Sequence, residues 1–154
     1  KDKWHFMALF AGIHNATIDD KGRVVLPSAF KKALGTMKVD QIILEKNRLG
    51  KCLDIHPVET WEKKVEAFQS KLRPGTNPKH YEMLKKFYRN FTQVGLATNG
   101  RINIPDGFLA YADLKDKVTF LGMGTSISLS SAAAFDNDDV SDDDYLDMLR
   151  EIDV

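Results

Sequence analysis

The 154-residue chain is poor in cysteine: Cys52 stands alone, so no disulfide can form within the chain. A lone cysteine agrees with a reducing, cytoplasmic environment. No apolar run approaches the length that a membrane-spanning helix needs. These absences argue against a disulfide-stapled secreted scaffold and a membrane protein. The 43% apolar content is instead typical of a globular protein.

The sequence also lacks the residue groupings that catalysis requires. Its histidines appear singly, with no cysteine or carboxylate at ligand spacing: His5, His14, His56 and His80. The stretch "GMGT" at residues 122–125 resembles a phosphate loop but lacks the following Lys-Ser/Thr, which favours a hairpin turn. We therefore expect no enzyme activity, catalytic residue, metal site, cofactor or small-molecule substrate.

The net charge is zero, but the charges are unevenly distributed along the chain. Residues 136–154 carry nine acidic residues and one base, whereas residues 1–135 carry 21 Lys and Arg against 13 Asp and Glu. A basic body suits a polyanion, and an acidic tail can compete for the same surface. Deleting the tail should then strengthen nonspecific DNA binding. The plainer alternative is a solvated surface with a disordered tail.

Two stretches of the chain echo each other: "DDKGRVVLP" at residues 19–27 and "ATNGRINIP" at residues 97–105. Aligning them also pairs apolar positions further along, so each half reads strand, tight turn, strand, short helix, strand, loop, strand. The glycine of each copy suits the positive φ of a hairpin turn. The sequence therefore predicts one scaffold that is built twice.

A helical insert separates the two halves. Apolar residues recur at helical spacing in two stripes, which "RPGTNP" interrupts: Trp61, Val65, Phe68 and Leu72, then Tyr81, Leu84, Phe87, Tyr88 and Phe91. The two stripes predict two antiparallel helices. Such aromatic stripes are more typical of a core or an interface than of a cofactor site. The end of the chain, within residues 136–154, shows a weaker helical pattern, as expected of a tail helix that docks on a partner.

The turn "DDKGR" carries the chemistry that most strongly indicates a function. Asp19 and Arg23 are spaced so that the carboxylate can meet the guanidinium or the N–H groups of the turn. An arginine held in this way suits bidentate contact with guanine or phosphate, and Lys21 adds a mobile charge. The alternative is that the pair only stabilises a surface turn.

The chain resembles the MraZ family of bacterial regulators in three stretches that occur in order: "FAG…TIDDKGRVVLPSAFKKAL", "LDIHPVETWEKKV" and "GRINIP…VTFLGMGTSISL". It is also similar, more distantly, to AbrB-like swapped-hairpin DNA-binding folds. The resemblance implies an α+β fold, a β-barrel of two tandem strand-turn-strand-helix-strand repeats with a two-helix insert. We expect a domain at 10–135, with a first repeat at 10–57, an insert at 58–91 and a second repeat at 92–135. We expect an extension at 1–9, part of it a cloning remnant, and an acidic tail at 136–154.

The resemblance also implies a function, a DNA-binding transcriptional regulator of cytoplasm and nucleoid. Such proteins assemble into homo-oligomeric rings that bind direct repeats of double-stranded promoter DNA, including boxes upstream of their own division and cell-wall operon. Carried over by position, the DNA-binding residues are Asp19, Lys21, Gly22 and Arg23. Asn99 and Arg101 are weaker candidates.

The chain departs from the family pattern at the second turn, where Ala97 replaces a common acidic residue and leaves Arg101 without a carboxylate to hold it. "ISLSS" and "IHP" replace the usual Glu-(Ile/Leu)-Trp and Tyr-Pro, which suggests packing variation. Two other functions stay open: a protein-interaction or assembly module without DNA, and an AbrB-like antitoxin.

Overall fold

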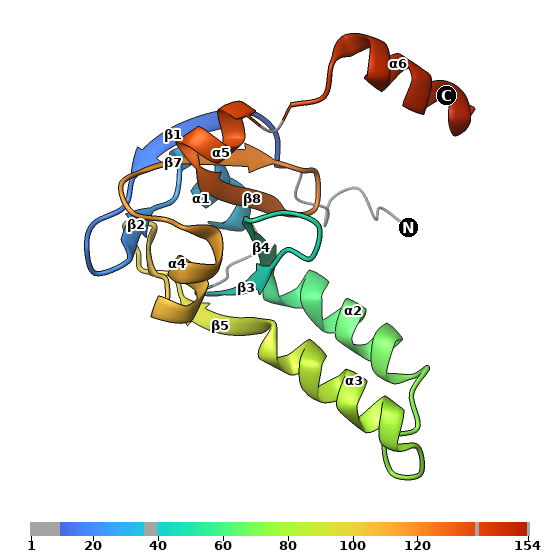
Figure 1. Ribbon diagram of the computed structural model, residues 1–154. Coiled ribbons are helices and arrows are strands. Elements are labelled where there is room, and N and C mark those ends of the chain that lie inside the picture. The colour runs from blue at the N-terminus through green and yellow to red at the C-terminus, as the bar shows by residue number, and fades with distance from the viewer. Residues whose placement is uncertain (1–9, 36–39, 138, 154) are drawn as a thin grey trace, which may run out of the picture.

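The computed structural model describes residues 10–35, 40–137 and 139–153 (Figure 1). The predicted extension at 1–9 and His5 lie outside these residues. Eight strands fall in the described part: β1 (Ile13–Thr17), β2 (Arg23–Val25), β3 (Gln41–Lys46), β4 (Leu53–Pro57), β5 (Phe91–Gly95), β6 (Arg101–Asn103), β7 (Lys117–Gly122) and β8 (Ile127–Ser131). Six helices accompany them: α1 (Ser28–Gly35), α2 (Val58–Gln69), α3 (Pro78–Arg89), α4 (Asp106–Ala112), α5 (Ala132–Asn137) and α6 (Asp142–Glu151). The predicted α+β class is confirmed.

The strands form an antiparallel six-stranded sheet in the order β1-β7-β8-β4-β3-β5, and a two-stranded ribbon of β2 and β6. Exchanging the halves maps β1 onto β5, β7 onto β3 and β8 onto β4, and the order then reads the same from the other edge. Both sheets thus combine strands from the two halves. The molecule therefore has an approximate internal twofold relation.

Two expectations about the strands need correction. The strands that flank each Gly-Arg turn were predicted to pair as a hairpin, but β1 pairs with β7, and β2 pairs with β6. A closed barrel was also expected, whereas β1 and β5 are the edges of the described sheet. The reason is that β2 and β6, three residues each, pair with one another and only lie beside β1 and β5.

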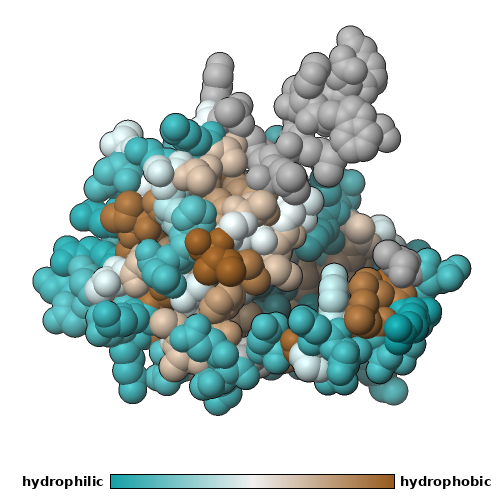
Figure 2. Space-filling view, turned by 90° about the horizontal axis from the view of Figure 1, so that it is seen from above, coloured by the Kyte–Doolittle hydropathy of each residue, from teal (hydrophilic) through white to brown (hydrophobic). Residues whose placement is uncertain are grey.

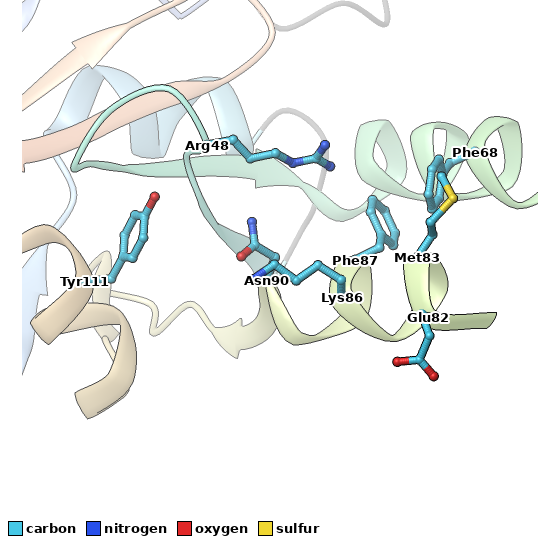
Figure 3. Close-up of a pocket in the computed structure, with 8 residues that line it drawn as sticks. All are labelled: Arg48, Phe68, Glu82, Met83, Lys86, Phe87, Asn90 and Tyr111. Carbon is cyan, nitrogen blue, oxygen red and sulfur yellow. The ribbon is translucent and has the colours of Figure 1, made fainter. Parts of the chain in front are cut away.

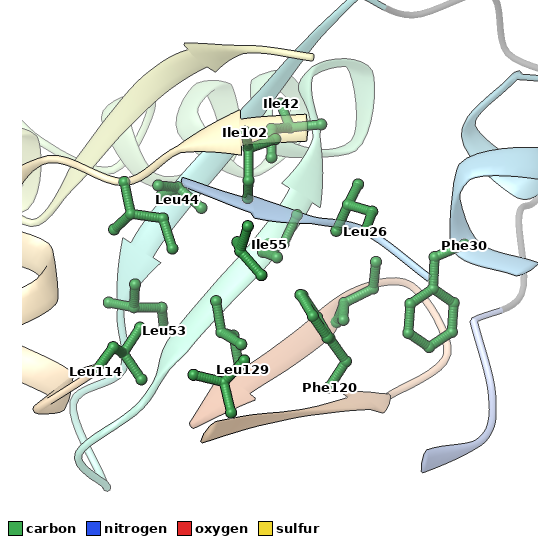
Figure 4. Close-up of a cluster of buried hydrophobic side chains, with 14 of the residues drawn as sticks. Leu26, Phe30, Ile42, Leu44, Leu53, Ile55, Ile102, Leu114, Phe120 and Leu129 are labelled. Atoms are coloured by element: carbon green, nitrogen blue, oxygen red, sulfur yellow. The ribbon is translucent and has the colours of Figure 1, made fainter. Parts of the chain in front are cut away.

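The main core lies between the ribbon and the inner face of the larger sheet (Figure 4). Apolar residues from both halves fill it, because the strands alternate inward and outward side chains. Its fully buried side chains include Leu26, Phe30, Leu44, Ile55, Ile102, Phe120 and Leu129. Both Gly-Arg turns are therefore attached to a ribbon whose inner face is anchored in this core.

The insert helices α2 and α3 run antiparallel and extend away from the body (Figure 1). Trp61 and Phe87 are buried in a second cluster with Ile43, so these two aromatics pack within the chain. Phe91 departs from the prediction: it opens strand β5 instead of ending α3. Asn90 follows the last helical residue, and its side-chain amide donates to the Lys46 carbonyl at 2.8 Å, which ties the chain to the sheet.

The predicted tail helix is present as α6, which stands apart from the body in Figure 1. Ser141 caps it by accepting from the Asp144 N–H at 3.1 Å. Apolar side chains on the face seen in Figure 2 appear as separate patches in a largely hydrophilic surface. Among the described helices, none has the length and apolar content to cross a membrane.

Candidate nucleic-acid interface

The first Gly-Arg turn, residues 19–23, is closed by its own backbone. The Asp19 N–H donates to the Arg23 carbonyl at 3.0 Å, and the Gly22 N–H donates to the Asp19 carbonyl at 3.1 Å. Gly22 has a φ of +79°, which side-chain-bearing residues rarely adopt. The glycine therefore allows the tight turn between β1 and β2.

The Asp19 carboxylate braces this turn on two sides. Its Oδ1 accepts from the Lys21 N–H at 3.0 Å and from the Arg23 N–H at 2.9 Å. Its Oδ2 pairs with the Arg23 Nε at 2.6 Å. The carboxylate therefore meets both the guanidinium and the turn N–H groups, as the spacing predicted. Because the pair uses Nε, the terminal guanidinium nitrogens lie outside this contact.

The brace is partly exposed, with 41% of the Arg23 side chain and 38% of the Asp19 side chain accessible. The hydrogen bond from the backbone N–H of Arg23 is the largest cause that lowers the pKa of Asp19; desolvation opposes it, and the Arg23 side chain and the Lys21 N–H lower the pKa further. Asp19 is consequently ionised at neutral pH. The turn thus presents an oriented arginine and an exposed Lys21 to solvent.

The first turn rests on the second half of the chain. The Ile104 N–H donates to the Gly22 carbonyl at 2.8 Å. A Cβ at Gly22 would lie 2.6 Å from the Ile104 carbonyl oxygen and 2.9 Å from the Leu109 side chain. No local pattern in the sequence predicts this close approach, because it joins residues more than 80 positions apart.

The second turn, residues 97–101, repeats the backbone of the first without its carboxylate. The Ala97 N–H donates to the Arg101 carbonyl at 3.0 Å, and Gly100 has a φ of +88°. The Asn99 Oδ1 accepts from the Arg101 N–H at 3.0 Å, a substitute that sequence reasoning missed. The exposed Arg101 side chain has no partner among the described residues. The two arginines therefore differ in how firmly they are held.

The two turns lie at opposite ends of the β2–β6 ribbon. Arg23 pairs with Asn103, and Val25 pairs with Arg101, so the ribbon is symmetric about Val24 and Ile102. The structure does not bring all six predicted residues into one cluster. It forms two small sites, one braced and one not.

Two of the described histidines, His14 and His80, make ordinary packing or hydrogen-bond contacts. His14 contacts the Phe30 ring edge-on, and the His80 Nδ1 accepts from the Arg73 N–H at 2.8 Å. The "GMGT" stretch is a hairpin turn between β7 and β8, as predicted, closed by the Met123 N–H donating to the Ser126 carbonyl.

His56 differs from the expectation that it stands alone. Its ligand atom lies within 4.8 Å of carboxylate oxygens of Glu45 and Asp54, because β3 and β4 pair and place the three on neighbouring positions. The His56 Nε2 and a Glu45 oxygen are 2.9 Å apart, and Asp54 accepts from the Asn47 amide. Burial raises the pKa of Asp54, and Glu45 adds to this, while the Asn47 hydrogen bond opposes it. These three residues are the described group that could hold a metal ion.

Comparison with known proteins places the chain in a family. A family model described as "MraZ protein, putative antitoxin-like" matches residues 9–73. The transcriptional regulator MraZ of Phocaeicola vulgatus is 30% identical over 143 residues, covering 93% of this chain and 92% of that protein. The chain belongs to the MraZ family. The transcriptional regulator MraZ of Alkaliphilus metalliredigens is 31% identical over 150 residues, covering 95% of this chain and all of its own length.

Within this MraZ-family chain, the matches differ between the two halves. The family model covers the braced turn and ends beyond α2, so the second turn falls outside it. The full-length relatives extend across both halves, and their names describe them as transcriptional regulators. The resemblance expected from the sequence is thus confirmed.

Proposed function

We propose that this chain is a sequence-specific DNA-binding transcriptional regulator that reads promoter DNA through the turn at residues 19–23. The observation that carries the proposal is the Asp19 carboxylate holding Arg23 through its Nε and its backbone N–H. An arginine fixed before binding loses less side-chain freedom when it contacts a guanine or a phosphate. Lys21 at the tip adds a phosphate contact that carries no sequence information.

The second turn has a lesser role in this proposal. Arg101 lacks the carboxylate that Arg23 has, so it contacts the DNA backbone without fixing a base, with Asn99 shaping its turn. Residues 10–57 and 92–135 are the two repeats of one scaffold, which explains why a second turn of the same shape exists. The insert at 58–91 and the tail at 136–154 are additions to that scaffold.

A single turn gives limited discrimination, about 1–3 kcal/mol for one good bidentate contact. We therefore propose that copies of the chain assemble into a ring that places several braced turns against direct repeats, including boxes upstream of its own operon. Linked sites raise the effective concentration of each turn, so repeated weak contacts become a specific complex. The protein would act in the cytoplasm, on the nucleoid.

The test compares two variants of the same turn on the protein's own upstream DNA, over a salt series. Arg23→Ala should lose sequence preference, since it removes the base contact. Lys21→Ala should weaken binding to all sequences alike and lower the salt slope by about one. Arg23→Ala that keeps the wild-type affinity and preference would show that Arg23 is not the reader.

The same experiment separates the alternatives of an assembly module and an antitoxin. The assembly module predicts that duplex DNA is bound weakly or not at all, with no dependence on Arg23, whereas an AbrB-like antitoxin has a DNA-binding fold and is distinguished by its toxin. The family model's description as antitoxin-like keeps the second of these relevant. A toxin encoded next door, neutralised equally by wild type and Arg23→Ala, would favour it over the regulator.

A further inference from the structure

The C-terminal helix α6 has an apolar face that its own chain leaves largely uncovered. Tyr145, Met148 and Ile152 are 54%, 49% and 68% exposed, and they follow one another at helical spacing with Leu149 between them. Acidic residues surround this stripe: Asp142 and Asp144 border it, at i, i+3 and i, i+4 spacing from Tyr145 and Met148, and Asp143 lies on the opposite face. A ten-residue helix is marginal in water by itself, so the pattern indicates a helix built to be buried elsewhere.

A groove of matching character opens on the insert helices (Figure 3). It has a volume of about 620 Å³ and lies between α3, the end of α2 and the β3–β4 turn. Phe68, Met83 and Phe87 provide its apolar surface, and Figure 3 shows Arg48 and Lys86 extending over the same space. Both cations are exposed, and neither forms an ion pair with a described residue.

The groove and the helix complement one another in charge and in polarity. The groove offers two cations against one acid, Glu82, whose partner is Lys85. The helix offers an acidic face against one base, Arg150, which is paired with Asp147. An acidic amphipathic helix laid on this groove would bury its apolar stripe and place carboxylates near Arg48 and Lys86.

The connection to α6 favours docking between copies over docking within one chain. Helix α5 contacts β7 and β8, whereas α2 contacts β3 and β4, and α3 contacts β5 at the far edge of the sheet. Only four residues separate α5 from α6, a stretch that spans at most about 18 Å between the helix ends. In Figure 1, α6 extends from the α5 end of the body, whereas α2 and α3 extend from the opposite end.

We propose that α6 of one copy docks into the groove formed by Phe68, Met83, Lys86 and Phe87 of a second copy. Such a head-to-tail contact joins different surfaces on the two partners, and it closes into a ring when the rotation between neighbours allows. The proposal rests on the assembly proposed above, but it does not depend on DNA binding. It assigns the tail a structural role between subunits.

Photo-crosslinking of the full-length chain tests the proposal. Tyr145 is replaced by p-benzoylphenylalanine, and ¹⁵N-labelled protein is mixed with unlabelled protein before irradiation. Mass spectrometry should find mixed-label crosslinks between the α6 peptide and residues 78–89. The same photo-reactive residue at Asp143, on the opposite face of α6, should give at least about fivefold fewer of them.

Charge reversal in the groove gives the second arm. Lys86→Glu should lower the mixed-label yield at least about fivefold, because it places a like charge beside the acidic helix, whereas Lys86→Arg should keep it. Lys86 is exposed, so both variants should keep the wild-type unfolding midpoint. Crosslinks confined to single-label pairs, or directed to residues 19–23, would overturn the proposal, as would a yield indifferent to Lys86→Glu. Arg23-dependent DNA binding is measured separately, so either proposal can fail while the other stands.

Discussion

At the residue scale, the proposed function depends on how the two carboxylate oxygens of Asp19 hold Arg23. One carboxylate oxygen holds two backbone N–H groups and the other holds the arginine Nε. Both side chains are partly exposed, so the ion pair adds little to the stability of the fold. Its effect is to restrict the orientation of Arg23 before any ligand arrives.

Gly22 should be the residue of this turn that tolerates substitution least. Gly22→Ala forces a side chain into positive φ and places its Cβ 2.6 Å from the Ile104 carbonyl oxygen. We expect a loss of about 1–3 kcal/mol in the free energy of unfolding, measured by urea denaturation. Gly107→Ala is the matched control: nothing lies within 4 Å of its Cβ, and it sits in helix α4. That variant should be neutral or more stable.

The pKa of Asp19 offers a direct view of the brace. It is depressed in the folded protein, so its contribution to stability is present at neutral pH and is lost as the pH falls through the folded pKa. Arg23→Ala should return the pKa only part of the way to its ordinary value, because the backbone N–H at position 23 remains. An NMR titration of the Asp19 carboxyl carbon measures this. A complete return would contradict the leading role of the backbone hydrogen bond.

At the element scale, local signals in the sequence predicted the elements better than their partners. The Gly-Arg turns, the short helix of each half (α1 and α4) and the insert helices all appear where the sequence pattern predicted them. The pairing of β2 with β6 was not predicted, because the register between distant strands leaves no local pattern in the sequence. The same reason hid the approach of Gly22 to Ile104. The brace could be predicted because its two residues are only four positions apart.

The insert helices should depend on their small aromatic cluster. Phe87 is 8% exposed and contacts the rings of Trp61 and Phe68 at centroid distances of 5.7 and 4.6 Å. Phe87→Ala should lower the free energy of unfolding by about 3–5 kcal/mol, measured by chemical denaturation. Tyr88→Phe, which removes only an exposed hydrogen bond to Gln69, should cost less than about 1 kcal/mol. Equal losses in the two variants would show that the cluster does not hold the insert.

At the scale of the whole molecule, the two halves form one scaffold with unequal surfaces. The twofold relation of the strands gives both turns the same backbone, while only the first keeps a carboxylate. The acidic residues of the chain are concentrated after the second half, so the body is basic although the net charge is zero. A basic body attracts DNA at long range, and the tail opposes that attraction.

Neutralising part of the tail should therefore strengthen nonspecific DNA binding. The variant Asp136→Asn, Asp138→Asn, Asp139→Asn removes three negative charges ahead of α6 and leaves that helix intact. We expect severalfold tighter binding to a random duplex at low salt, with the difference shrinking as salt screens the charges. Fluorescence anisotropy over a salt series measures both. An affinity that does not change at low salt would contradict the competition.

The proposed role of Asp19 and Arg23 in DNA binding is tested most directly by a double-mutant cycle on these two residues, with affinity for the protein's own upstream DNA as the readout. Simple electrostatics predicts that removing the acid in Asp19→Ala tightens DNA binding. The brace predicts the opposite: Asp19→Ala should weaken specific binding when Arg23 is present and have no such effect in the Arg23→Ala background. If Asp19→Ala tightens binding equally in both backgrounds, Asp19 does not hold Arg23 in position for DNA.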